Sequence, residues 1–129
     1  MAVEILHHFF LNNGKHYMKN RIKIDNDRLF PVQAFLNVIP DEYFIRTLKN
    51  LVEGIGATYN DVGCCFPGDL DPGDETFEGI NFGVLNEEVV ISRREFFGYL
   101  QKAAQEYIKM YPSDSEETLR LLKIFERSC

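Results

Sequence analysis

The sequence predicts an α+β fold in a single domain, residues 1–129, with a small antiparallel β-hairpin or sheet packed against three to five α-helices. Three observations lead to this prediction. An amphipathic helical pattern covers residues 93–111, and a β-branched run, Val89 to Ile91, precedes it. The chain has 129 residues and 45% hydrophobic content, which is enough to bury one core.

The N-terminal third contains two candidate helices. Residues 3–11 carry apolar side chains at helical spacing and predict a short helix. The alternative is a hairpin turning at Asn13 and Gly14, because an Asn-Gly pair between β-prone runs favours a tight turn. The residues leave both open. A second apolar run, 29–39, has Pro31 where it suits the first turn of a helix.

A clearer helix begins near Pro40 and ends at Gly54. Its first turn carries acidic residues at the positive end of the helix dipole. Its apolar face is formed by Phe44, Leu48, Leu51 and Val52. Residues 57–79 then contain turn-forming pairs at short intervals, which predict a long loop with a short strand near 64–66. Loops of this length in small domains usually have a function.

The C-terminal third contains a hairpin and two helices. Residues 79–85 and 88–92 predict two strands joined at Asn86 and Glu87. Ser92 with Glu95 forms a capping box that opens the long helix, and Pro112 ends it. A second capping box, Ser113 with Glu116, predicts a final helix with an inward-facing side formed by Leu119, Leu122 and Phe125.

Negative charge is concentrated in one part of the chain. The net charge is −6, but the segment 50–92 contains nine acidic residues and no Lys or Arg. We call this the acidic segment. Soluble surfaces usually mix charges of both signs, so an unmixed block indicates a positively charged partner. The same charge argues against direct binding to nucleic acid, which requires a basic surface.

The candidate binding residues lie in the stretch FPGDLDPGDETFEGINF, residues 66–82, where carboxylates alternate with Gly, Pro and Phe. Apolar anchors surrounded by charges are typical of protein interfaces. A solubilising surface loop is the alternative interpretation. The predicted contact residues are Asp69, Asp71, Asp74, Glu75, Phe77 and Glu78.

Catalytic, metal and cofactor sites are not predicted. A calcium loop starting at Asp69 has Asp74 where the motif needs Gly and Ile80 where it needs Glu. The adjacent Cys64 and Cys65 lack the spacing of zinc or redox sites and are expected to be free thiols. No nucleophile motif or phosphate-binding loop occurs, so we expect no enzymatic activity and no cofactor.

The localisation expected from the sequence is cytoplasmic. The first residues lack the basic start and clean apolar core of a signal peptide. No stretch reaches the roughly 18 apolar residues of a membrane span.

Four motifs carry a resemblance to a known family: FPGD at 66–69, FEG at 77–79, ISRREF at 91–96 and a helix ending in YPSD at 111–114. In this order they resemble immunity proteins of bacterial contact-dependent growth inhibition systems, in the group paired with ribonuclease toxins. The likeness covers about residues 41–118.

The resemblance implies a non-enzymatic protein that binds and neutralises the nuclease domain of a cognate toxin. An acidic loop suits that task, because a ribonuclease binds RNA through a basic cleft. Two other hypotheses remain open on the residues alone. One is a small carboxylate- or metal-dependent enzyme using Asp69, Asp71, Asp74 and Glu78, and the other is a phosphate-mimicking inhibitor of a DNA-binding protein.

Overall fold

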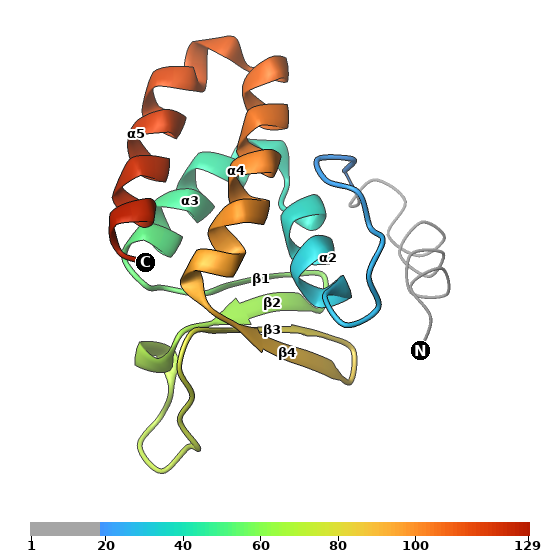
Figure 1. Cartoon of the computed structure of the whole chain (residues 1–129), viewed down its shortest axis with the longest axis vertical. Coiled ribbons are helices and arrows are strands. Elements are labelled where there is room, and N and C mark those ends of the chain that lie inside the picture. The colour runs from blue at the N-terminus through green and yellow to red at the C-terminus, as the bar shows by residue number, and fades with distance from the viewer. Residues whose placement is uncertain (1–18) are drawn as a thin grey trace.

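The described helices all lie on one face of a four-stranded antiparallel sheet (Figure 1). The computed structural model describes residues 19–129, so the helix or hairpin expected within residues 1–18 lies outside the described part. The strands are β1 (Ala57–Tyr59), β2 (Val62–Cys65), β3 (Ile80–Val84) and β4 (Glu87–Ile91). The helices are α2 (Phe30–Val38), α3 (Phe44–Val52), α4 (Arg93–Met110) and α5 (Ser115–Arg127). The predicted α+β class is therefore confirmed.

The sheet has the simple order β1-β2-β3-β4 and is built from two tight hairpins. Alternation of side chains along each strand separates a buried face from an open face. The buried face carries Val62, Cys64, Ile80, Phe82, Val84 and Ile91. Among the described residues, no helix covers the other face, which points away from the helical layer (Figure 1).

A series of packed aromatic rings joins the sheet to three helices. Phe82 of β3 lies with its ring centroid 5.6 Å from that of Phe35 in α2 and 4.9 Å from that of Phe96 in α4. Phe96 is in turn 5.8 Å from Phe125 of α5. All four rings are completely buried. Offset and edge contacts of this kind add to the burial of apolar surface, so these rings form the centre of the core.

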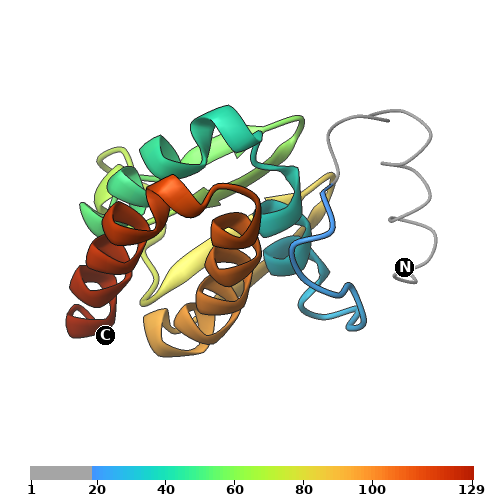
Figure 2. The same cartoon turned by 90° about the horizontal axis from the view of Figure 1, so that it is seen from above.

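Helix α2 lies at the centre of the molecule, where it packs on β2, β3 and α4. Every residue of α2 is buried, which agrees with its nearly continuous apolar sequence, and Pro31 occupies the first turn as predicted. Its buried Asn37 side chain accepts a hydrogen bond from Ile22 N and donates one to Ile22 O. The segment before α2 is thereby fixed against it. Seen from above, the helices spread side by side over the sheet (Figure 2).

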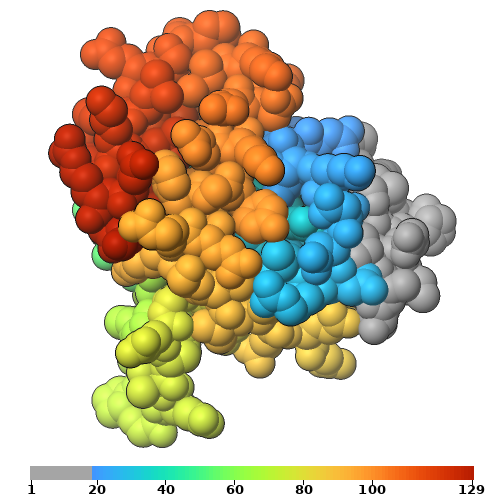
Figure 3. All heavy atoms as spheres, in the orientation of Figure 1, coloured from blue at the N-terminus to red at the C-terminus, as the bar shows by residue number. Residues whose placement is uncertain are grey.

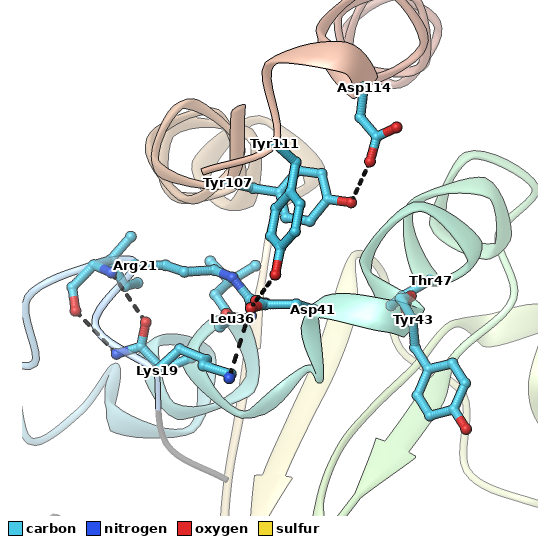
Figure 4. A network of polar contacts seen from close by, with 11 residues as sticks. Lys19, Arg21, Leu36, Asp41, Tyr43, Thr47, Tyr107, Tyr111 and Asp114 are labelled. Atoms are coloured by element: carbon cyan, nitrogen blue, oxygen red, sulfur yellow. Dashed lines mark hydrogen bonds and ion pairs between the residues drawn. The ribbon is translucent and has the colours of Figure 1, made fainter. Parts of the chain in front are cut away.

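Asp41 connects three parts of the chain through its carboxylate (Figure 4). Its carboxylate accepts hydrogen bonds from Arg21 at 2.7 Å and from the Tyr111 hydroxyl at 2.9 Å, and Lys19 lies 3.6 Å away. Burial alone would raise the pKa of Asp41, but the Tyr111 hydrogen bond and the charges of Arg21 and Lys19 outweigh it and lower the pKa. Asp41 thus does more than complement the dipole of α3.

Helix α4 begins as predicted, with the Ser92 side chain accepting a hydrogen bond from Glu95 N at 3.0 Å. The chain then turns at Pro112, and α5 runs back along α4 and α3. Two details of α5 were predicted wrongly. Ser113 is not its N-cap, because a 3-10 turn places Asp114 there without a side-chain cap. Leu119 is 52% exposed, whereas Leu121 is buried beside Leu122.

The prediction of a loop over residues 57–79 is wrong for its first part, which forms the β1-β2 hairpin, although the short strand predicted near 64–66 overlaps β2. Asn60 and Asp61 have φ angles of 51° and 64°, the left-handed values of a two-residue type I′ hairpin turn. The β3-β4 turn also differs by one residue, since Leu85 and Asn86 connect the pair formed by Val84 and Glu87. No helix of the described chain is long and apolar enough to cross a bilayer.

The aromatic series predicts a large effect of one truncation. Phe82→Ala removes a completely buried ring that contacts Phe35 and Phe96, so the free energy of unfolding should fall by about 3–5 kcal/mol. Urea unfolding measures this change. Met110→Ala is the control: this side chain is 69% exposed, and its loss should change the free energy by less than about 0.5 kcal/mol. Equal effects of the two variants would contradict the proposed core.

The lowered pKa of Asp41 predicts a specific loss of stability in acid. Its contribution is complete above the unfolded-state pKa of about 3.9 and disappears as the pH falls through the lower folded-state value. Asp41→Asn should therefore be less stable than the wild type by about 2 kcal/mol at neutral pH, because Arg21 loses its charged acceptor. The gap should close towards pH 2, as urea unfolding across the pH range will measure. The exposed Glu42→Gln should show no such convergence.

Candidate functional site

The acidic segment contains all four strands of the sheet and the loop between β2 and β3. It spans both strands of the first hairpin, the connection 66–79 and the second hairpin, and eight of its nine carboxylates are exposed. The connection, which we call the acidic loop, projects from the body of the domain on the side away from the helices (Figure 3). Negative charge is therefore presented at a protruding part of the surface.

The base of the acidic loop is rigidly attached. Phe66 is buried, and the guanidinium carbon of Arg93 lies 5.0 Å from the centre of its ring. The Asp69 carboxylate accepts hydrogen bonds from Phe66 N at 2.8 Å and from Gly56 N at 3.0 Å. Asp69 thereby ties the start of the loop to the residue before β1. Asp69 was predicted as a contact residue and has a structural role at the base of the loop.

The projecting part is shaped by a turn over residues 71–74. Asp74 N donates to Asp71 O at 3.1 Å, Pro72 follows the first residue, and Gly73 has a φ of 96°. This is the arrangement of a type II turn. The Asp74 side chain also accepts a hydrogen bond from Asp71 N at 2.9 Å. The loop therefore has a defined conformation.

The loop returns to the sheet at Gly79, which has a φ of 96°. A side chain there would place its Cβ 2.3 Å from Ile91 O, so only glycine fits. This close approach places the end of the loop against the last residue of β4.

The remaining predicted carboxylates, Asp71, Asp74, Glu75 and Glu78, are exposed in the projecting part. The ion pairs formed within residues 19–129 take their acidic partners from outside the acidic segment, namely Asp41, Glu95, Glu106 and Glu117. The four loop carboxylates take part in none of these pairs. Their charge is uncompensated by the described part of the chain.

The three phenylalanines near the loop have different roles. Phe66 and Phe82 are completely buried in the core. Phe77 is half-buried and does not belong to that core. It is therefore the aromatic ring of this stretch that remains available as an apolar anchor.

The chemistry of the neighbouring thiols does not favour nucleophilic catalysis. Burial raises the pKa of Cys64 to about 12. Burial, together with the charges of Asp69, Asp74 and Glu88, also raises the pKa of Cys65. Thiolates would be scarce at neutral pH. Within residues 19–129 no group of three His, Cys, Asp or Glu side chains is placed to hold a metal ion.

The open face of the sheet carries a hollow that sequence reasoning missed. Its volume is about 490 Å³. It is lined by Thr58, Asp61, Gly63, Cys64, Cys65, Asn81, Gly83, Leu85, Asn86 and Glu88. The hollow depends on the register that places Gly63 opposite Gly83, and neither glycine marks a site when its strand is considered alone. All the lining residues belong to the acidic segment.

Comparison with known proteins identifies one related family. A family model described as "CDI immunity protein" matches residues 24–122, which include every element from α2 to most of α5. A comparison with curated proteins returned no match.

The two hydrogen bonds accepted by Asp69 lead to a prediction. Asp69→Ala removes the acceptor for two backbone N–H groups, so the free energy of unfolding should fall by about 1 kcal/mol. Hydrogen exchange at Phe66 N and Gly56 N should accelerate. Glu75→Ala is the matched control in the same loop and should leave both measurements unchanged. If the two variants behave alike, Asp69 does not brace the loop.

Proposed function

The chain belongs to the CDI immunity protein family, and from this premise we propose that it neutralises a cognate ribonuclease toxin of a contact-dependent growth inhibition system. The acidic loop binds the basic RNA-binding cleft of that toxin. Inhibition requires no chemistry by this chain, because a protein that occupies the cleft excludes the substrate. Family membership supports the immunity function, and the acidic loop supports the class of toxin.

The observation that carries the proposal is the uncompensated charge on a loop with a fixed base. Asp71, Asp74, Glu75 and Glu78 project together and have no basic neighbour within the acidic segment. A field of one sign steers an oppositely charged partner towards the loop and accelerates association. The hydrogen bonds of Asp69 and Asp74 hold the loop in one shape before binding, which lowers the entropic cost of ordering it.

A ribonuclease cleft is the basic surface that best suits this loop. Such a cleft binds a polyanion through Lys and Arg side chains, so a row of carboxylates can take the places of phosphates. Phe77 supplies apolar contact beside those charges. A half-buried ring outside the core can be buried further by a partner without disturbing the fold.

Neutralising the loop should slow toxin binding. We choose Asp71→Asn, Glu75→Gln and Glu78→Gln combined, because Asp69 and Asp74 make hydrogen bonds that hold the loop. The association rate constant for the toxin domain encoded beside this chain should fall by about tenfold or more at low salt, and its salt dependence should weaken. Stopped-flow or surface plasmon resonance measurements give both quantities.

The control carries the same change of charge elsewhere. Glu42→Gln, Glu116→Gln and Glu126→Gln combined also alter three exposed carboxylates, so both variants change the net charge from −6 to −3. The control should retain most of the association rate and full protection of cells. If the loop variant binds as fast as the control, the loop is only a solvated surface. A toxin that cleaves DNA instead of RNA would contradict the assigned toxin class but not the role of the loop.

A further inference from the structure

The hollow on the open face of the sheet has a floor without side chains. Gly63 of β2 and Gly83 of β3 lie directly opposite each other in the register. Thr58 and Glu88 continue the same cross-strand row on either side. The row therefore has larger side chains at its ends and bare backbone in the middle.

The fold does not require glycine at position 83. Gly83 is outside the left-handed region, and a Cβ there would meet its nearest atoms at 3.7 and 3.8 Å, which is ordinary van der Waals contact. Gly63 differs, because its Cβ would lie 2.6 Å from Thr58 Oγ1. Glycine inside a strand weakens the strand and often marks a place where another molecule approaches closely. Gly83 fits this description.

Leu85 lies at the rim with an unusual backbone conformation and an exposed side chain. Its φ of 56° is a conformation that favours Asn or Gly, and its side chain is 46% exposed. The backbone strain reduces the stability of the free protein. Such features persist at sites that bind a partner, and Leu85 lines the hollow.

The polar groups of the hollow are suited to a cation. Glu88 accepts a hydrogen bond from Asn81 Nδ2 at 3.0 Å, which orients its carboxylate on the open face. Asp61 adds a second carboxylate to the rim, and the acidic segment supplies no Lys or Arg. A Lys or Arg side chain would bring a positive charge to these two carboxylates.

We propose that this hollow is a second contact site for the toxin and receives one of its Lys or Arg side chains, with Glu88 as the counter-ion and Leu85 as the apolar rim. The proposal rests on the proposed function and extends it from the acidic loop to the sheet. The loop and the open face lie on the same side of the molecule, away from the helices (Figure 1). One partner can therefore contact both.

Two substitutions separate binding from folding. Gly83→Val fills the floor with a residue that favours strands, and Leu85→Asn suits the left-handed turn while removing the apolar rim. The melting temperature of Leu85→Asn should rise by a few degrees. Each variant should nevertheless raise the Kd for the toxin domain by about tenfold or more, mainly through faster dissociation.

Gly98→Ala is the control for these variants. Gly98 is exposed in α4, and a Cβ there meets nothing within 4 Å. This change should stabilise the helix and leave toxin affinity at the wild-type value.

Cys65 allows the site to be located directly, because its half-buried side chain lines the hollow. Its raised pKa slows alkylation at neutral pH, so labelling with iodoacetamide is best done near about pH 9. Bound toxin should slow the labelling of Cys65 by about tenfold or more but leave Cys129 unaffected, as peptide mass spectrometry will measure. Cys129 lies at the end of α5 and serves as the internal reference.

The outcomes distinguish this inference from the proposed function. If the wild type fails to bind the toxin domain, both are wrong. The second contact site alone is wrong under a different set of results. In that case the wild type binds, the loop variant binds slowly, both hollow variants keep the wild-type Kd, and bound toxin does not slow the labelling of Cys65. Should Gly83→Val fail to fold, Leu85→Asn and the labelling of the wild type still decide the question.

Discussion

The burial of one face of the sheet beneath aromatic rings is the constraint on which the other features depend. Phe82 lies between Phe35 and Phe96, so a single strand residue fixes both α2 and α4 over the sheet. Phe125 extends the same contact to α5. Because these helices are attached to one face, the described helical layer leaves the other face open. The alternation of side chains then sends Asn81, Gly83 and Glu88 to that open face.

The residues that hold the fold and those that remain available for a partner are largely different. Asp41 accepts hydrogen bonds from Arg21 and Tyr111 and so joins three parts of the chain. Asp69 accepts hydrogen bonds from two backbone N–H groups at the base of the acidic loop. The other loop carboxylates make no ion pair within the described chain. Substitution of these exposed carboxylates should cost little stability, whereas substitution of Asp41 or Asp69 should destabilise the domain.

Elements with a strong period or cap could be predicted from the sequence. Helix α4 has a side-chain cap at Ser92 and a regular apolar face, and β4 is a β-branched run. Strand β1 has only three residues, which is too short to show a periodicity, so the sequence predicts a loop there. The predicted N-cap of α5 was wrong because a 3-10 turn moves the start of the helix past Ser113. Charge alone located the acidic segment, but the hollow required the register of β2 against β3, which no single strand encodes.

The arrangement of charge also determines which residues affect the association rate constant for the toxin and which affect the dissociation rate constant. Like charges on the loop repel one another in the free protein, and water and salt screen this repulsion because the groups are exposed. Their main effect therefore falls on the encounter, which depends on ionic strength. A carboxylate held in a hollow of the sheet makes its hydrogen bonds only at short range, after water has left. Long-range attraction by the loop and short-range contact at the sheet are thus separable properties of one acidic segment, and substitutions in the two places should affect association and dissociation independently.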